Sequence, residues 1–332
     1  MITIHYLGPE GTFSERAVRD MAQMTFEEAS RQSCEFVPHQ TLSRAMTAVC
    51  DAVDADAFAV VPYYNLIEGL IQETLDLLIE RDLTVFSAMQ LPVCFALGGF
   101  VQKDASVVQT ANIDWPVTEK VSVFSHPKAL AQCSTFFQQN LPAAIWREST
   151  STSQAVKQVA EDRFGLAVAR RETLEQSGLP VLADDVGNRL YSRQNYTEFL
   201  LVGRASSAAN IASNKVPNET ASLQQRTLIA VVPAVDYVGL LADILGQIAF
   251  FGINLFKIHS RPAPTDDDGP APQMFYLETD TPVDSPELRL CFETLEMRLA
   301  KQGNVNREEK PCVVRVLGAY ELLTCQTTKS MP

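Results

Sequence analysis

Runs of consecutive apolar residues recur along the first two thirds of the chain, and most are followed by a polar turn and then by helical spacing. The runs predict buried strands at Ile2 to Leu7, Phe58 to Val61, Val121 to Phe124, Leu166 to Ala169 and Phe199 to Val202. Leucine and isoleucine at intervals of three and four between 67 and 78 predict one of the intervening helices. This order of strand, turn and helix is typical of an α/β fold.

The polar turns of this region are candidate binding elements. Gly8-Pro9-Glu10-Gly11 follows the first strand, and Thr12 or Ser14 can cap the helix after it. Ser125-His126-Pro127 follows a later strand, and Ser151-Thr152-Ser153 precedes another helix. Because open α/β sheets bind ligands beyond the carboxyl ends of their strands, we expect a site where these turns meet.

The last third of the chain predicts a separate small domain. Residues 205–225 are rich in Ser, Ala and Asn and predict a linker between a first region, 1–204, and a second domain, 226–322. The second domain has the order β-α-β-β-α-β of a ferredoxin-like unit. Its strands are predicted at Thr227 to Val232, Ile253 to Ile258, Met274 to Leu277 and Val313 to Leu317, and its helices at Leu240 to Phe250 and over the apolar positions from 288 to 299.

Composition narrows the function classes. The net charge of −13 over 332 residues argues against a nucleic-acid partner, although local cations in a cleft can still hold an anionic substrate. No leader and no membrane span is predicted, because the apolar stretch from Leu240 to Leu255 is short and polar in places. Seven scattered Cys indicate reduced thiols in the cytoplasm, and four dispersed His predict no metal site.

An ordered set of motifs covers nearly the whole chain outside the linker. The first region contains Tyr6-Leu7-Gly8-Pro9-Glu10-Gly11-Thr12-Phe13-Ser14, Val61-Pro62 with Asn65, Glu68-Gly69, Glu73-Thr74-Leu75-Asp76-Leu77-Leu78, Ser125-His126-Pro127, Ser151-Thr152-Ser153-Gln154-Ala155 and Asn195-Tyr196-Thr197-Glu198-Phe199. The second contains Val238-Gly239-Leu240-Leu241, Ile253-Asn254-Leu255, Ser260-Arg261-Pro262 and Arg315-Val316-Leu317-Gly318. In these motifs the sequence resembles the prephenate dehydratase family with a C-terminal ACT domain.

The resemblance implies a two-lobed, periplasmic-binding-protein-like catalytic region with prephenate bound between the lobes. It also implies a homodimer or homotetramer whose ACT domain binds an aromatic amino acid, and a reaction that needs no cofactor. The effector-lining positions would be Gly239, Leu240, Asn254 and Leu255. The specificity of that effector site is open, because His259 and Val238 replace the family's usual acidic residue and proline.

Two positions depart from the family pattern. Tyr64 stands where the family has a glutamate, and Glu198 stands where it has an arginine. A carboxylate of Glu198 about 4 Å from a substrate carboxylate would cost about 4 kcal/mol at an effective dielectric of ~20, or roughly a thousandfold in binding. Three alternatives remain open: Glu198 points elsewhere, it is protonated, or the substrate sits differently. Arg170, after the strand ending at Ala169, is a candidate replacement cation.

The candidate site residues follow from the turns and the resemblance. The expected catalytic residues are Thr197, Glu198 and Tyr64. The expected substrate-binding residues are Thr12, Ser14, Asn65, Ser125, His126, Ser151, Thr152, Ser153, Arg170 and Phe199.

Three functions remain as hypotheses. Decarboxylation of prephenate with retention of its hydroxyl group is slightly favoured, because a glutamate in place of a carboxylate-pairing arginine suggests altered chemistry. The first alternative is a prephenate dehydratase, which removes both carbon dioxide and water. The second is a sensor that binds prephenate or phenylalanine without turnover.

Overall fold

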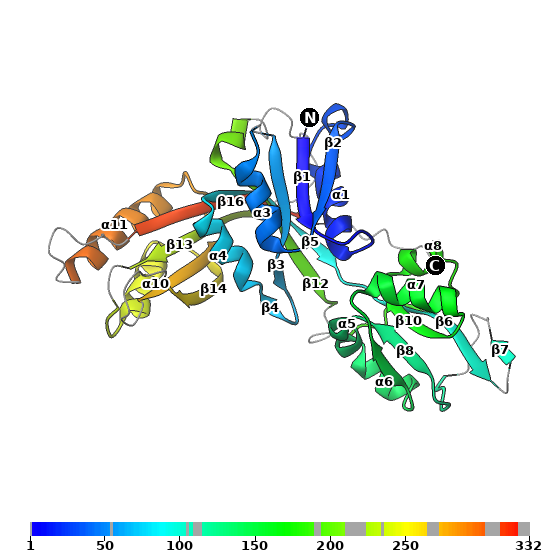
Figure 1. Cartoon of the computed structure of the whole chain (residues 1–332). Coiled ribbons are helices and arrows are strands. Elements are labelled where there is room, and N and C mark those ends of the chain that lie inside the picture. The colour runs from blue at the N-terminus through cyan, green and yellow to red at the C-terminus, as the bar shows by residue number, and fades with distance from the viewer. Residues whose placement is uncertain are drawn as a thin grey trace.

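The computed structural model describes residues 2–53, 56–103, 106–108, 115–188, 194–209, 224–233, 236–263, 272–302 and 313–324. Most of the predicted linker lies outside these ranges. The described residues form two lobes and a C-terminal unit (Figure 1).

The first lobe is a mixed sheet with helices on both faces. Strands β1, β2 and β3 are parallel, and β12 runs antiparallel between β3 and β5. Side chains of β3 alternate: Phe58 and Val60 pack towards α1, whereas Ala59 and Val61 pack towards α3 and α4. The elements are β1 (Ile2–Leu7), α1 (Phe13–Thr25), α2 (Glu28–Arg31), β2 (Cys34–His39), α3 (Leu42–Asp51), β3 (Ala57–Asn65), β4 (Gly69–Leu70), α4 (Gln72–Glu80), β5 (Leu83–Pro92) and β12 (Tyr196–Arg204), followed by the 3₁₀ turn η1 (Ala205–Ser207).

The second lobe is built on a separate sheet in the order β11-β6-β10-β8-β9, with β7 on the edge of β6. Two segments join the lobes, and they are hydrogen-bonded to each other where the Val93 N–H donates to the Asn195 carbonyl at 2.8 Å. The elements are β6 (Ala96–Lys103), β7 (Ser106–Val108), β8 (Ser122–Ser125), α5 (Pro127–Gln132), α6 (Ser134–Asn140), β9 (Ile145–Glu148), α7 (Thr152–Asp162), β10 (Gly165–Ala169), α8 (Arg171–Gln176) and β11 (Val181–Ala183).

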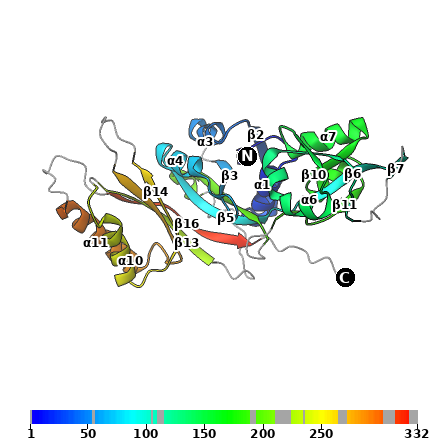
Figure 2. The ribbon, with the colours of Figure 1, turned by 90° about the horizontal axis from the view of Figure 1, so that it is seen from below.

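The C-terminal unit has the predicted βαββαβ order, with strands arranged β14-β15-β13-β16. Its two helices lie together on one face of the sheet (Figures 1 and 2). They bury Ile229 and Val231 with Ile244 and Leu295. The elements are β13 (Gln224–Val232), α10 (Leu240–Phe250), β14 (Leu255–Pro262), β15 (Gln273–Thr279), α11 (Pro286–Gln302) and β16 (Val313–Thr324).

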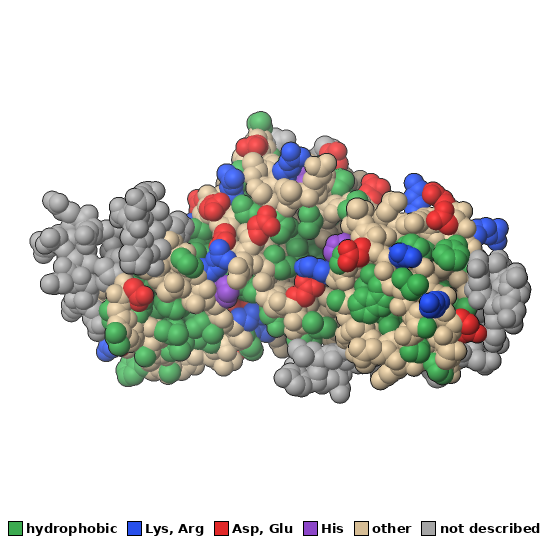
Figure 3. Space-filling view, turned by 60° about the horizontal axis from the view of Figure 1, so that its bottom comes forward, with side chains coloured by type: hydrophobic (Ala, Val, Ile, Leu, Met, Phe, Trp, Pro, Cys, Tyr) green, Lys and Arg blue, Asp and Glu red, His purple; other side chains and the backbone are tan. Residues whose placement is uncertain are grey.

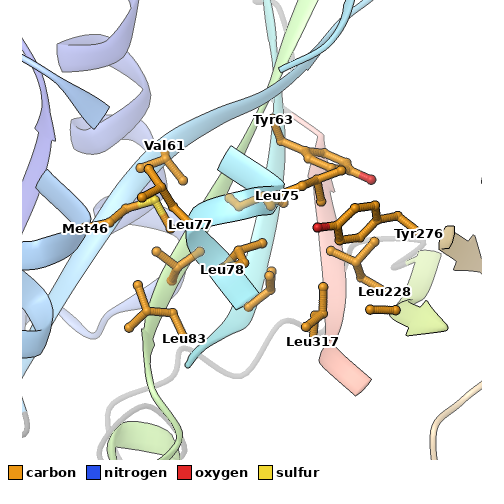
Figure 4. Packing of buried hydrophobic residues seen from close by; sticks show 14 of the residues in the cluster. Met46, Val61, Tyr63, Leu75, Leu77, Leu78, Leu83, Leu228, Tyr276 and Leu317 are labelled. Carbon is orange, nitrogen blue, oxygen red and sulfur yellow. The ribbon is translucent and has the colours of Figure 1, made fainter. Parts of the chain in front are cut away.

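The sheets of the first lobe and of the C-terminal unit are continuous. Strand β16 pairs in parallel with β5, so ten strands belong to one sheet. The face of the C-terminal sheet that α10 and α11 leave uncovered packs against α4 of the first lobe. Figure 4 shows Leu75 and Leu78 facing Leu228, Tyr276 and Leu317. Each such large apolar side chain contributes about 1.5–3 kcal/mol when fully buried. The first lobe and the C-terminal unit, which the sequence predicted to be separate domains, therefore share a hydrophobic core.

The predicted strands and helices are present, but several strands extend beyond their predicted ends and one helix starts later than predicted. The apolar spacing from residue 67 predicted this helix, whereas α4 begins at Gln72, because Gly69 has a left-handed φ of 85° and Gly69–Leu70 pair with β3 as β4. Strand β3 continues from Val61 to Asn65 through Pro62. A proline is tolerated there because the pairing of β12 shifts register between Glu198 and Phe199, where Pro62 lies opposite. The pairing of β5 with β16 was not predicted.

Gly318 provides a test of the junction between β16 and β5. A Cβ atom at this position would lie 2.4 Å from the Val85 carbonyl oxygen. We predict that Gly318→Ala lowers the free energy of unfolding by about 2–3 kcal/mol through overpacking. Gly246→Ala is the control, because a Cβ there meets nothing within 4 Å and alanine favours the helix by up to about 1 kcal/mol. Urea unfolding measures both variants; equal stability of the two would contradict the prediction.

Candidate functional site

A cleft of about 330 Å³ lies between the two lobes, where the sequence predicted a site. Both lobes contribute polar side chains to it, and Phe13, Val93, Phe95 and Phe199 form an apolar wall. Of the predicted site residues, Thr12, Ser14, Asn65, His126, Ser151, Thr152, Thr197 and Phe199 line this cleft.

Asn65 organises the first-lobe side of the cleft. Its Nδ2 donates to Thr197 Oγ1 at 3.0 Å and to the Tyr196 carbonyl at 3.2 Å. Its Oδ1 accepts from the N–H groups of Ile67 and Glu68, both at 3.0 Å. One buried amide therefore fixes both the Thr197 hydroxyl and the loop that follows β3. Because Thr197 Oγ1 accepts from Asn65, its own hydroxyl hydrogen points away from that amide.

Helix N-termini from both lobes point their partial positive charge at the cleft. Thr12 caps α1, with its hydroxyl accepting from the Glu15 N–H at 3.4 Å. Ser151 caps α7 and accepts from the Gln154 N–H at 3.0 Å. Unsatisfied N–H groups and the helix dipole favour an anion at such ends. The cleft thus suits a ligand with two separated negative charges.

Contacts between the lobes hold both rims of the cleft. On one rim, Ser153 Oγ donates to the Gly11 carbonyl at 3.2 Å and Arg170 Nη2 donates to the same oxygen at 3.3 Å. On the other rim, Lys128 Nζ lies 2.7 Å from Glu68 Oε2 and Gln132 Nε2 donates to Glu68 Oε1 at 2.9 Å. The two lobes are therefore bridged on either side of the ligand space.

Three predicted binding residues lie next to the cleft but do not line it. Ser125 is buried and donates to the Val168 carbonyl at 2.7 Å. Ser153 makes the interlobe bond to Gly11. The Arg170 guanidinium lies 5.7 Å from the centre of the Phe13 ring, and its pKa is lowered by burial. Arg170 therefore holds the Gly11 loop through its carbonyl without lining the cleft itself.

Glu198 does not face the cleft, which answers the question that its sequence position raised. Neighbouring residues of a strand point to opposite faces, so Thr197 faces the cleft and Glu198 the C-terminal unit. The Glu198 side chain is only 2% exposed, and its Oε1 lies 2.9 Å from Lys257 Nζ of β14. Of the three alternatives, the first holds: Glu198 points elsewhere.

Tyr64 shares the face of Glu198, because the two residues are directly opposite in the register of β3 and β12. Its ring centre lies 4.9 Å from Lys257 Nζ and 6.3 Å from the Tyr196 ring centre. The two residues that depart from the family pattern are thus neighbours. Neither lines the cleft.

Several cleft residues were not chosen from the sequence. Glu68, Lys128 and Gln132 line the cleft together with Phe13 and Phe95. Lys128 and Gln132 are four residues apart on α5 and therefore lie on one face of that helix; this polar pair directly after the Ser125-His126-Pro127 turn is the signal that could have found them. Lys128 and His126 are the basic side chains among the described cleft-lining residues.

The four predicted effector positions lie in the C-terminal unit. Gly239 has a left-handed φ of 101° and precedes α10, and Leu240 is buried in the core of the unit. Asn254 Nδ2 donates to Asp280 Oδ2 at 3.3 Å, and Leu255 begins β14. Gly239 and Asn254 are exposed in this chain, whereas Leu240 contacts the sheet.

The described part of the chain contains no group of three or more His, Cys, Asp or Glu placed to hold a metal ion. Within the same part, no helix is both long enough and apolar enough to cross a membrane.

Known proteins resemble this chain over most of its length. The family model for prephenate dehydratase matches residues 4–207. A prephenate dehydratase of Bacillus subtilis is 27% identical over 322 residues, which cover 96% of this chain and 98% of the relative. A prephenate dehydratase of Amycolatopsis methanolica is 34% identical over 263 residues, which cover 79% of this chain and 74% of the relative.

A solved structure shows the same architecture. The crystal structure of a prephenate dehydratase from Arthrobacter aurescens in complex with L-Phe aligns with a TM-score of 0.67 and 25% identity, over 96% of this chain and 90% of that chain. The family match over residues 4–207 covers the two-lobed region, and the solved structure shows the same fold over nearly the whole chain. The chain belongs to the prephenate dehydratase family.

Proposed function

We propose that this protein is a prephenate dehydratase, which converts prephenate to phenylpyruvate, carbon dioxide and water. The observation that carries the proposal is the Thr197 hydroxyl, fixed by Asn65 in a cleft with helix N-termini from both lobes. Prephenate carries two carboxylates and a ring hydroxyl, and the cleft provides complementary groups for each.

Binding of the two carboxylates would use groups from opposite lobes. The N-termini of α1 and α7 offer N–H donors beside Thr12 and Ser151. Lys128 supplies the flexible cation at the rim and can exchange Glu68 for a substrate carboxylate. Since exposed ion pairs are worth little, that exchange costs little.

The reaction needs a proton for the leaving hydroxyl group. The ring carboxylate leaves as carbon dioxide, its electron pair enters the ring, and the C–O bond to the hydroxyl breaks as that oxygen takes a proton and leaves as water. The Thr197 hydroxyl is the donor, because Asn65 occupies its oxygen as acceptor and leaves its hydrogen directed elsewhere. The Thr197 oxygen then regains a proton from solvent, which supplies the one proton that the overall reaction of the dianion consumes. The aromatic rings of Phe13 and Phe199 provide the apolar wall for the ring that becomes aromatic.

The slight preference for decarboxylation with retention of the hydroxyl is replaced by the dehydratase alternative. That preference depended on a Glu198 carboxylate facing the substrate, whereas Glu198 is paired with Lys257 outside the cleft. The relatives over most of this chain are prephenate dehydratases. The non-catalytic sensor is the remaining alternative, and the product assay below tests it directly.

The C-terminal unit is proposed to be an ACT domain that binds an aromatic amino acid. The related Arthrobacter aurescens structure contains L-Phe. Exposed apolar side chains at this end of the molecule, including Val238, Leu241, Leu245 and Phe250, support pairing of two copies in a homodimer or homotetramer (Figure 3). The cytoplasmic location also stays a prediction.

The product formed from prephenate tests the proposed function. We expect phenylpyruvate as the product at neutral pH, at a rate well above the spontaneous reaction measured without protein. Absorbance of the phenylpyruvate enolate in alkali and chromatography of the product measure it. A non-aromatic product that keeps its hydroxyl would establish decarboxylation alone, and binding of prephenate without turnover would support the sensor.

Lys128→Met should weaken substrate binding without removing the catalytic group. We expect KM to rise about tenfold, which corresponds to ~1.4 kcal/mol, with kcat less affected. Lys157→Met is the matched control, because Lys157 is 68% exposed against 67% for Lys128 but pairs with Glu161 away from the cleft. The effect should shrink at high salt. An equal KM for the two variants would show that Lys128 does not contribute to substrate binding.

Asn65→Asp separates the two tasks of Asn65. The carboxylate can still accept from the Ile67 and Glu68 N–H groups, but it cannot donate to Thr197 or to the Tyr196 carbonyl. We expect kcat of Asn65→Asp to fall about a hundredfold, because Thr197 loses its donor. Asn65→Ala also leaves the Ile67 and Glu68 N–H groups without an acceptor, so its free energy of unfolding should be about 1–3 kcal/mol lower than that of Asn65→Asp. Steady-state kinetics and urea unfolding measure these effects. Wild-type kcat in Asn65→Asp would show that the bond to Thr197 is dispensable.

A further inference from the structure

Strand β12 carries two adjacent residues with opposite surroundings. Thr197 lines the cleft, and Glu198 lies on the opposite face against the C-terminal unit. Residues opposite Thr197 in the neighbouring strands are Asn65 and Leu91, and those opposite Glu198 are Tyr64 and Gln90. Whatever fixes Glu198 therefore also fixes the backbone that presents Thr197.

Glu198 belongs to a buried ionic cluster that crosses between the two units. Lys257 Nζ lies 2.9 Å from Glu198 Oε1 and 2.8 Å from Glu278 Oε2. Gln90 Nε2 donates to the other Glu198 oxygen at 3.3 Å, and the Tyr63 hydroxyl donates to Glu278 Oε2 at 3.2 Å. One ammonium group thus joins a carboxylate of β12 to a carboxylate of β15.

The charges of this cluster make Lys257 indispensable to it. The side chains of Glu198 and Glu278 are both 2% exposed, and Arg226 Nε lies 3.9 Å from Glu278 Oε1. Burial alone would lower the pKa of Lys257, but the two carboxylates outweigh it and raise that pKa. Removing one partner of a buried ion pair leaves an uncompensated charge, which is more costly than the pair is stabilising.

We propose that Lys257 is a positioning residue for the active site: the C-terminal unit holds Thr197 in place through the Lys257–Glu198 ion pair. The proposal rests on the proposed dehydratase function, in which Thr197 delivers the proton. It makes the C-terminal unit part of the framework that positions Thr197. In this chain the glutamate at 198 is then the partner of a lysine on β14.

The position of Thr197 is sensitive to small shifts of β12. Its hydroxyl is 3.0 Å from Asn65 Nδ2, and a displacement of about 1 Å in a reacting group can reduce a rate a hundredfold. The pairing shift between Glu198 and Phe199 leaves β12 irregularly paired with β3 next to Thr197. The Lys257–Glu198 ion pair therefore holds β12 next to the point where its hydrogen bonding to β3 is interrupted.

A second ion pair between the units provides a matched control. Arg261, also on β14, lies 2.8 Å from Asp76 Oδ2 of α4. Both pairs join the same strand of the C-terminal unit to the first lobe. Only Lys257 reaches the strand that carries Thr197. If both ion pairs only dock the C-terminal unit, removing either one should lower activity equally. If the Lys257–Glu198 pair positions Thr197, only removal of Lys257 should lower kcat.

The experiment compares Lys257→Met, Lys257→Arg, Glu198→Gln and Arg261→Met in the full chain with prephenate as substrate. We expect Lys257→Met to lower kcat at least tenfold with KM changed less than threefold, Lys257→Arg to restore most of kcat, and Arg261→Met to stay within threefold of the wild type. Glu198→Gln is the milder variant if Lys257→Met does not fold, because Lys257 keeps Glu278; its kcat should fall at least threefold. An equal fall of kcat in Lys257→Met and Arg261→Met would show that the Lys257–Glu198 ion pair only docks the C-terminal unit, and it would overturn the proposal.

The pH profile gives a readout that a merely structural role does not move. Glu198 is faced by Lys257, Glu278 and Gln90, and by the tyrosines Tyr63, Tyr64 and Tyr320, with Arg226 beyond Glu278. Burial raises the pKa of Glu198, and Lys257 offsets only part of that rise. Without Lys257 the pKa of Glu198 should rise further, so kcat of Lys257→Met should fall as pH rises through this raised pKa and Glu198 ionises against Glu278. An unchanged pH profile would contradict the proposal.

A spectroscopic measurement keeps this test independent of turnover. In protein labelled at threonine methyl groups, the Thr197 signal, assigned with Thr197→Val, should shift in Lys257→Met and not in Arg261→Met. If the wild type produces no phenylpyruvate, the proposed function fails while the methyl signal still decides the positioning role. An unmoved Thr197 signal in Lys257→Met overturns that role.

Discussion

Strand β12 is hydrogen-bonded on both edges, to β3 and to β5, and the arrangement of the molecule on either side of it follows from that pairing. On one face it presents Thr197 and Phe199 to the cleft. On the other it presents Glu198 to the C-terminal unit. Because the strand returns from the second lobe beside β5, the same pairing also closes the connection between the lobes. A register change in this one strand would move side chains between solvent, substrate and the buried ion pair.

Much of the fold was predictable from the sequence because its signals are local. Apolar runs mark many of the strands, and capping residues recognised before helices, such as Thr12 and Ser151, do lie at the cleft. The pairing of β16 with β5 was not predictable, because a parallel contact between segments far apart in the chain has no local signature. Lys128 was missed for a similar reason, since an exposed lysine on a helix is ordinary until the opposite lobe is in place.

Glu198 shows why a substituted motif residue cannot be interpreted from the motif alone. Its sequence position, next to Thr197, suggested repulsion of a dianionic substrate. The alternation of a β-strand places it on the other face, where a lysine from 59 residues further along the chain neutralises it. The neighbouring change at Tyr64 lies on the same face and contacts the same ammonium group. The two departures therefore alter the contact between units and leave the cleft lining with its hydroxyl and amide groups.

The position of β16 has a consequence for how the chain is made. Strand β5 is synthesised early, yet both strands that cover its edges, β12 and β16, come later, and β16 comes last among the described elements. A nascent chain on the ribosome therefore carries an open strand edge until synthesis reaches residues 313–324. Open edges are templates for pairing with the wrong chain. Completion of the last strand is thus the event that closes this edge of β5 during translation.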